Sequence, residues 1–548
     1  MTGTEPAIYR QTWHGDATQL SFDPAGAARA LRRIGRPVYV VRKDGATGIA
    51  TEGTVTLGAP TPPAPGASLA LLAVAPPLVP AALGDPSFMA FHGIRYPYVA
   101  GAMANGITSV AMVEAVAKAG MLGFFGAAGL SLDAVTSAID TLRQRLGALP
   151  FGSNLIHSPQ EPDLEAAVVD LYLERGVSRI SASAYLRITL PLVLYRVKGI
   201  HRNADGAVVC PNRVVAKVSR EEVAEKFLSP PPEKLLRDLV AAGQITMDEA
   251  SLAAFVPMAD DISAEADSGG HTDNRPALTL LPTMLALRDT MAERFGYRRV
   301  PTVGLGGGIA TPESAAAAFA MGAAYVLTGT VNQACMESGT CDAVRQMLAE
   351  AGQADVIMAP AADMFEMGVK VQVLKRGTMF AVRAAKLYDV YQRYGSWESV
   401  PDDQRAAIER DVLRSRFEAE WERTRAFFTQ RDPRQVERAE KDPRHRMALV
   451  FRSYLGQSSK WSVHGVPDRR IDYQIWCGPA IGAFNRWARG TFLEKPENRR
   501  TVNVARNLLT GACVVTRAAW LRQQGVALPP LAARFSPLTD EQLDALTG

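Results

Sequence analysis

Short apolar runs alternate with amphipathic segments along the middle of this chain. Several of the runs are separated by stretches with the 3.6-residue periodicity of a helix. The eight runs lie at residues 98–101, 121–125, 151–155, 178–182, 214–218, 262–266, 300–303 and 323–327. Short, mostly apolar strands that alternate with helices are typical of a buried parallel sheet. Eight of them predict an α/β fold of the TIM (β/α)8 barrel type.

The pattern departs from a simple repeat in two places. After the fourth run the chain continues through an apolar stretch, 185–199, and a polar turn. After the fifth run, residues 219–261 carry two helical patterns broken by three prolines. Both segments leave the carboxyl ends of predicted strands, where the substrate loops of such barrels lie. We therefore predict insertions after strands 4 and 5, a helical segment at about 185–261 that serves the substrate.

The regions that flank the barrel have different patterns. The first ninety residues are rich in Gly, Ala and Pro, with short β-like runs between turn signals. Beyond residue 385 the pattern is mostly helical, and 404–429 alternates acidic and basic residues as a solvated helix does. The predicted domains are an accessory region (1–90), the barrel (91–384) and a mostly helical carboxyl-terminal region (385–548).

Composition and charge exclude several classes of function. The chain has 548 residues, 47% of them hydrophobic and 21% charged, which is ordinary for a globular protein. Its net charge of +4 provides no general attraction to nucleic acid. The most apolar stretch, 67–83, is too short and too rich in proline to span a membrane, and the amino terminus does not look like a signal peptide. The five cysteines lack CxxC spacing, which argues against a zinc site. We expect a cytoplasmic protein with no nucleic-acid, membrane or metal partner.

Two glycine loops follow the last two predicted strands. Gly306, Gly307 and Gly308 follow the seventh strand, and Gly329 and Thr330 follow the eighth. Because one helix joins these strands, the loops should lie side by side at the carboxyl ends of neighbouring parallel strands. Glycine lets the backbone approach a ligand closely, and free N–H groups in such loops and at helix starts can bind a phosphate. TIM barrels often bind phosphate at this position, although a pair of tight turns without a ligand is the alternative.

Other strand ends carry small or polar residues that suit a planar ligand. Ala102 and Met103 follow the first strand and could lie along a flat ring. Asn154 ends the third strand, and its amide offers both a donor and an acceptor to the edge of a heterocycle. Gly270 and His271 end the sixth strand, where His271 could protonate a substrate or polarise a carbonyl. A phosphate beside a planar heterocycle fits flavin mononucleotide (FMN) best, and spacing alone leaves a sugar phosphate open.

These motifs resemble those of the nitronate monooxygenase/enoyl reductase flavoproteins. Other segments resemble a subgroup, the trans-acting enoyl reductases of polyunsaturated fatty acid and polyketide synthases, known as the PfaD family. They are 195–199 (YRVKG), 361–370 (AADMFEMGVK), 454–461 (YLGQSSKW) and 472–482 (DYQIWCGPAIG). The resemblance covers nearly the whole chain. One departure is at 267–271, where the superfamily often has EAGGH and this chain has DSGGH.

The resemblance implies a reaction and a set of site residues. NADPH would reduce FMN, and the reduced flavin would pass a hydride to the β carbon of a 2-enoyl thioester on an acyl carrier protein. His271 would be the catalytic residue, as proton donor or carbonyl partner. The residues implied for cofactor binding are Ala102, Met103, Asn154, Gly270, Gly306, Gly307, Gly308, Gly329 and Thr330.

Partners and alternative functions follow from the same resemblance. An acidic carrier protein would dock on a basic patch, for which the candidates are Arg376, Arg383, Lys386, Arg393 and the cluster 444–452. Two other functions stay open: a nitronate monooxygenase that uses the same cofactor, and a non-catalytic assembly subunit of a synthase. The sequence leaves open the choice between NADPH and NADH, and a homodimer is compatible with the aromatic tail.

Overall fold

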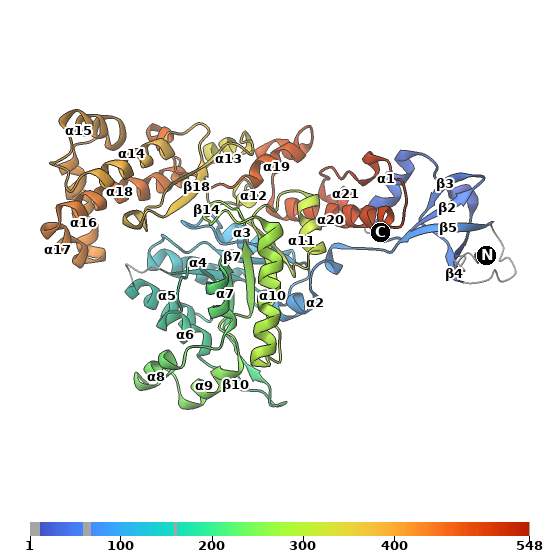
Figure 1. Ribbon diagram of the computed structural model, residues 1–548, viewed down its shortest axis with the longest axis horizontal. Helices are drawn as coiled ribbons and strands as arrows, with labels where there is room; N and C mark the ends of the chain where they lie inside the picture. The colour runs from blue at the N-terminus through green and yellow to red at the C-terminus, as the bar shows by residue number, and fades with distance from the viewer. Residues whose placement is uncertain (1–10, 58–66, 158–161, 547–548) are drawn as a thin grey trace, which may run out of the picture.

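The centre of the molecule is a closed barrel of eight parallel strands (Figure 1). The computed structural model describes residues 11–57, 67–157 and 162–546. The barrel order is β12-β13-β15-β16-β6-β7-β8-β9. The strands are β6 (Tyr98–Ala100), β7 (Leu122–Phe125), β8 (Gly152–Ile156), β9 (Arg179–Ser183), β12 (Arg213–Val218), β13 (Asp261–Glu265), β15 (Thr302–Gly306) and β16 (Val326–Thr328). Each predicted run overlaps one of these strands, so the predicted TIM barrel is confirmed.

Helices with one apolar face surround the barrel. They are α3 (Val110–Lys118), α4 (Leu132–Leu146), α5 (Pro162–Glu174), α6 (Leu190–Val197), α7 (Glu221–Leu228), α10 (Ala277–Phe295) and α11 (Pro312–Ala320). In α4, Val135, Ile139, Leu142 and Leu146 are buried at intervals of three or four residues, so one stripe of the helix packs on the strands. The side chain of Ser131 caps the first turn of this helix by accepting a hydrogen bond from the backbone.

Most of the inserted segment lies away from the mouth of the barrel. Its elements are the hairpin β10 (His201–Arg202) and β11 (Val208–Val209), then α8 (Glu233–Ala241) and α9 (Met247–Leu252). Figure 1 shows α8, α9 and β10 at the lower end, because α6 and α7 first run back along the barrel. Lys198 Nζ donates to the carbonyl of Gln244, which joins the two inserts there. Only their first residues, such as Tyr185 and Ser219, reach the mouth, so the substrate role predicted for the rest of the insertion was wrong.

The amino-terminal region is a small antiparallel sheet that contacts the last long helix of the chain. The sheet has the order β3-β2-β5-β1-β4. Its elements are β1 (Gln11–Gly15), α1 (Pro24–Arg32), β2 (Val38–Lys43), β3 (Ala46–Ala50), β4 (Thr54–Leu57) and β5 (Ala67–Ala75), and α2 (Pro86–His92) leads into the barrel. The buried guanidinium of Arg517, on α20 (Thr501–Gln523), donates to the carbonyls of Leu31 and Arg33 at the end of α1. These contacts place the end of α1 beside α20, although the bonded residues are 486 and 484 positions apart in the sequence (Figure 1).

The carboxyl-terminal region divides into two parts that pack on different cores. One part has its own apolar cluster and covers the mouth of the barrel. We call residues 361–371 together with α16 (Phe417–Arg431), α17 (Pro433–Lys441) and α18 (Pro443–His464) the roof. The other part, around α20, shares the apolar core of the barrel. The domain boundaries proposed from the sequence stay predictions.

The remaining elements connect these parts. They are α12 (Thr330–Gln333), α13 (Asp342–Ala349), β17 (Val356–Pro360), β18 (Lys370–Leu374), α14 (Phe380–Arg393), α15 (Asp402–Ile408), α19 (Ala480–Ala488) and α21 (Asp540–Asp544). Strand β18 pairs with β17 and with β14 (Gly270–His271) in a separate three-stranded sheet above the barrel. Within the described residues, every helix is too short or too polar to cross a bilayer.

Candidate active site

A cavity of about 930 Å³ opens at the carboxyl-terminal ends of the barrel strands, beneath the roof. This volume lies within the range of small-molecule and cofactor sites in proteins. All ten predicted site residues line it: Ala102, Met103, Asn154, Gly270, His271, Gly306, Gly307, Gly308, Gly329 and Thr330. The fold therefore brings together strand ends that are up to about 230 residues apart in the sequence.

The two glycine loops lie side by side at one wall of the cavity, because β15 pairs directly with β16. Gly307 and Gly308 have φ angles of 85° and 75°, which side chains strain to adopt. A Cβ atom on Gly307 would lie 2.6 Å from the carbonyl oxygen of Ala266, whereas Gly308 and Gly329 face open space. Among the described residues, the N–H groups of Gly308 and Gly329 have no hydrogen-bond partner, so both can bind an anion.

The start of the helix after the first glycine loop offers an anion fewer free N–H groups than the sequence suggests. Thr311 and Ser314 form a capping box at the start of α11, and each side chain bonds a backbone N–H. Those groups are therefore occupied within the helix itself. The second loop differs: the hydroxyl of Thr330 accepts a hydrogen bond from the N–H of Gly478 at 3.2 Å, which leaves its own proton to donate. The groups available to bind an anion are thus loop N–H groups and one hydroxyl.

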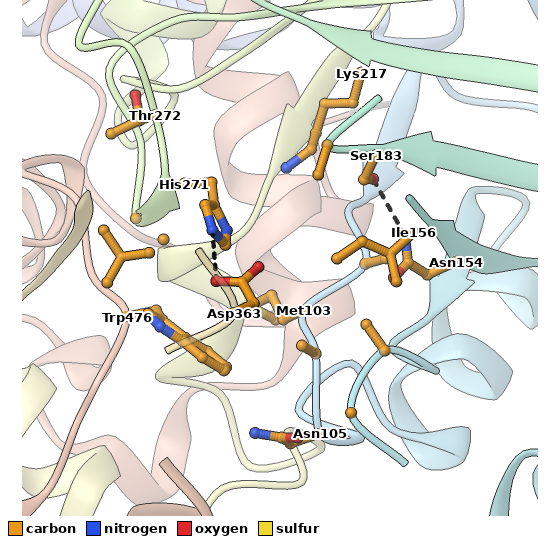
Figure 2. Close-up of a pocket in the computed structure, with 18 of the residues that line it drawn as sticks. Met103, Asn105, Asn154, Ile156, Ser183, Lys217, His271, Thr272, Asp363 and Trp476 are labelled. Carbon is orange, nitrogen blue, oxygen red and sulfur yellow. Dashed lines mark hydrogen bonds and ion pairs between the residues drawn. The ribbon is translucent and has the colours of Figure 1, made fainter. Parts of the chain in front are cut away.

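The loop after β6 is held firmly against the cavity. Thr108 Oγ1 donates to the carbonyl of Gly101 at 2.7 Å and accepts from the N–H of Met103 at 2.9 Å. A Cβ atom on Gly126 would lie only 1.8 Å from the carbonyl oxygen of Met103, so the neighbouring loop must have glycine there. These contacts hold the loop in which Ala102 and Met103 line the cavity. Figure 2 shows Met103 there.

Asn154 offers a ligand in the cavity fewer hydrogen-bonding groups than predicted. Its side chain is buried, and Nδ2 donates to the carbonyl of Ser181 at 3.1 Å and to Ser183 Oγ at 3.2 Å (Figure 2). Both partners belong to β9, the strand that pairs with β8. Because the neighbouring strand uses the amide protons, Asn154 can present only its Oδ1 acceptor to a ligand. The prediction that it supplies both a donor and an acceptor was therefore wrong.

His271 faces an acidic residue of the roof. The backbone of β14 pairs with β18, and His271 Nε2 lies 3.1 Å from Asp363 Oδ1 (Figure 2). Burial acts to lower the pKa of His271, but the hydrogen bond and the charge of Asp363 outweigh it, so the pKa is raised above its usual value. Sequence reasoning missed Asp363, which lies 92 residues away in the chain. Its only signal was that it falls in a family-like segment.

Lys217 is a second residue that sequence reasoning missed. It lies on β12, and its Nζ is 2.7 Å from Glu265 Oε1, which also accepts from Ser268 Oγ at 3.1 Å. Figure 2 shows the ammonium group directed toward the space beside His271. A lysine one residue from the end of an otherwise apolar strand (RVVAKV) was the available signal. It adds a fixed positive charge to the cavity.

Several residues of the predicted docking patch bond to other parts of the carboxyl-terminal region instead. Arg383 pairs with the buried carboxylate of Asp472, and Arg446 pairs with Glu418. Arg452 Nε donates to the carbonyl of Ala362 at 3.0 Å. Arginine side chains that are used internally in this way cannot also form a free docking surface, so the prediction was wrong for these three. Lys386 and Arg393 are exposed and keep that possibility.

Three family models match consecutive parts of the chain. Nitronate monooxygenase matches residues 85–396, which is more than half of the chain. The chain belongs to the nitronate monooxygenase family. The fatty acid synthase subunit PfaD N-terminal domain matches residues 13–77. The inserted helical domain of acyl-carrier-protein S-malonyltransferase matches residues 394–473, which include the roof helices.

Individual relatives of this family member include a polyunsaturated fatty acid synthase subunit and a polyketide biosynthesis protein. One of the polyunsaturated fatty acid synthase subunits of Thraustochytrium sp. is 49% identical over 80% of this chain and 30% of its own. Polyketide biosynthesis protein PksE of Bacillus subtilis is 45% identical over 79% of this chain and 56% of its own. The chain thus spans about a third to a little over half of these relatives. The crystal structure of the enoyl reductase domain of MlnA, from the macrolactin biosynthesis cluster of Bacillus amyloliquefaciens, is 37% identical with a TM-score of 0.76, over 81% of this chain and 99% of that one.

Proposed function

We propose that this family member is an FMN-dependent enoyl reductase that acts in trans on 2-enoyl thioesters carried by an acyl carrier protein, with NADPH as the hydride donor. One observation carries the proposal: a single cavity joins an anion-binding pair of glycine loops to His271 beneath a helical roof. The relationship to a solved enoyl reductase domain supports the reaction type. The synthase context of the curated relatives supports the carrier-bound substrate.

The residues of the cavity fit FMN. The free N–H groups of Gly308 and Gly329, with the hydroxyl of Thr330, would hold the phosphate. Met103 and the Oδ1 of Asn154 would contact the ring. When bound, FMN supplies the hydride transfer, which no side chain of this chain can perform.

The charged residues of the cavity have separate tasks in this proposal. His271, paired with Asp363, would hold a proton for the α carbon of the substrate or donate a hydrogen bond to the thioester carbonyl. Lys217 would stabilise negative charge that develops on the cofactor ring or on the substrate. The roof would exclude water from the reacting atoms.

The visible spectrum of the purified protein tests the cofactor and the donor together. We expect flavin absorption bands that NADPH bleaches without oxygen and that an enoyl-acyl carrier protein then restores. The saturated thioester should appear by mass spectrometry. Absence of turnover on enoyl thioesters of short, medium and long chains would overturn the proposal.

Nitronate monooxygenase is the second candidate, because that family model matches the barrel itself. It predicts that an alkyl nitronate bleaches the flavin without NADPH. A third candidate, a non-catalytic assembly subunit, predicts a colourless protein that does not take up FMN. The homodimer and the cytoplasmic location stay predictions, which light scattering and fractionation can test.

A further inference from the structure

We propose that Asp363 is a positioning residue that orients the imidazole of His271 and pairs with its positive charge, so that the roof supplies the partner of an acid on β14, at the mouth of the barrel. This inference rests on the enoyl reductase function proposed above. Its basis is the 3.1 Å contact between His271 Nε2 and Asp363 Oδ1 in the cavity.

The backbones of both partners are held by hydrogen bonds to other segments. His271 lies on β14, which pairs with Val371 of β18. Asp363 follows Ala361, whose N–H donates to the carbonyl of Val369 at 2.9 Å, and Ala362, whose carbonyl accepts from Arg452 of α18. The pair therefore joins two segments that both bond to residues 369–371, and Arg452 gives the segment of Asp363 a further support from α18.

The contact determines which nitrogen of the ring can meet a ligand. Because Nε2 faces Asp363, Nδ1 is left for the cavity, and it has no hydrogen-bond partner among the described residues. A charged imidazole carries a proton on each nitrogen, and the carboxylate accepts the one on Nε2. His271 can thus present its Nδ1–H group to the substrate.

The other charges near His271 act in both directions. Lys217 lowers the pKa of His271 and Glu265 raises it, while burial, the largest effect, lowers it. Asp363 alone accounts for the two strongest influences that raise it. The charged form of His271 therefore persists to higher pH with Asp363 than without it, and proton donation should fail as pH rises through that pKa.

Packing does not require this pair. The side chains of His271 and Asp363 are 35% and 48% exposed, whereas those of a second histidine–aspartate pair in the barrel, His92 and Asp261, are both fully buried. Both side chains are surrounded by the walls of the cavity but open to the space inside it, and solvent that reaches an ion pair weakens its contribution to stability. A carboxylate held open to the cavity beside an imidazole is therefore better explained by the chemistry of the site.

Direct titration of His271 in the FMN-bound protein provides the first test. The chain has seven histidines, so selective labelling resolves them by NMR, and His271→Gln assigns the signal. Asp363→Asn should lower the pKa of His271, and Asp363→Glu should restore it in part. Glu366→Gln removes a neighbouring roof carboxylate that pairs with Arg452 and should leave that pKa unchanged. An unchanged pKa in Asp363→Asn would overturn the inference.

The kinetics of the two half-reactions provide the second test. In Asp363→Asn, bleaching of the flavin by NADPH should stay within about twofold, whereas reoxidation by enoyl substrate should slow by about tenfold at neutral pH. The pH at which reoxidation falls off should also move downward. A shifted pKa with unchanged reoxidation and pH profile would reject the positioning role. If the wild type reduces no enoyl substrate, the proposed function and the catalytic role fail together, while a shifted pKa would still establish the pairing.

Discussion

The two ends of the barrel both carry ion pairs, which differ in how open their side chains are to solvent. At the amino-terminal end, Arg196 and Asp260 pair at 2.6 Å with side chains that are 1% and 9% exposed. At the carboxyl-terminal end, Lys217 and Glu265 pair at 2.7 Å but are 24% and 14% exposed, and the His271 pair is more open still. Ion pairs whose side chains are closed to solvent stabilise the fold. In a pair that is open to solvent, a side chain can exchange its partner for a ligand.

Burial explains the difference in physical terms. Asp261 is fully buried, which raises its pKa, but Arg299 and His92 outweigh burial and hold the pKa well below its usual value. His92 has its pKa lowered, chiefly by burial. A carboxylate of this kind stays ionised to low pH, so the stability it contributes is lost only under strong acid.

Asp260→Asn gives the largest expected effect. The substitution leaves the guanidinium of Arg196 buried beside a neutral amide, and breaking a buried pair in this way costs about 3–5 kcal/mol of unfolding free energy. The urea midpoint should fall, while FMN binding by the folded fraction stays the same. Asp363→Asn is the matched control at the open end and should leave the midpoint nearly unchanged. Equal losses in the two variants would contradict the comparison.

Gly308→Asp should weaken FMN binding by about 100-fold. The new carboxylate would fill the open space beside Gly308, where we propose that the phosphate binds, and would repel it. Gly176→Asp is the control: its φ of 63° carries similar strain and its surroundings are open, but it lies in the turn before β9 at the other end. Fluorescence titration with FMN measures both. Similar loss of binding in the control would show that backbone strain, and not the site, is responsible.

Lys217→Met should slow bleaching of the flavin by NADPH by about tenfold, because a cation that stabilises developing negative charge is removed. Stopped-flow absorbance measures the rate. Glu265→Gln keeps the lysine charge and should have a smaller effect. An unchanged rate in Lys217→Met would mean that its pairing with Glu265 is structural, as at the opposite end.

Arg434→Ala gives the smallest expected effect. Arg434 of α17 lies 3.5 Å from Asp163 of α5 and joins the roof to the barrel, but the two side chains are 64% and 90% exposed. Solvent screens such a pair, so neither the thermal midpoint nor the Michaelis constant should change measurably. A rise in the Michaelis constant alone would show that this bridge holds the mouth in its working shape.

The sequence predicted the barrel well because its signals are local. Each strand is a short apolar run, and the glycines at 307 and 308 have positive φ angles that favour glycine. The insertion was harder: its helical patterns were visible, but nothing local reveals that α6 and α7 carry it to the far end. The prediction that Asn154 donates to a ligand failed for the same reason, because its amide N–H groups bond to β9 across the sheet.

The sequence by itself determined the strand–helix alternation, the two glycine loops and the position of His271 after a strand, because these depend on residues close together in the chain. Only the tertiary structure decided which charged side chains pair. Lys217 pairs with Glu265 across the sheet, and His271 pairs with Asp363 in a roof that packs on a separate apolar core. Pairing between distant segments depends on how cores pack, and no local pattern encodes that.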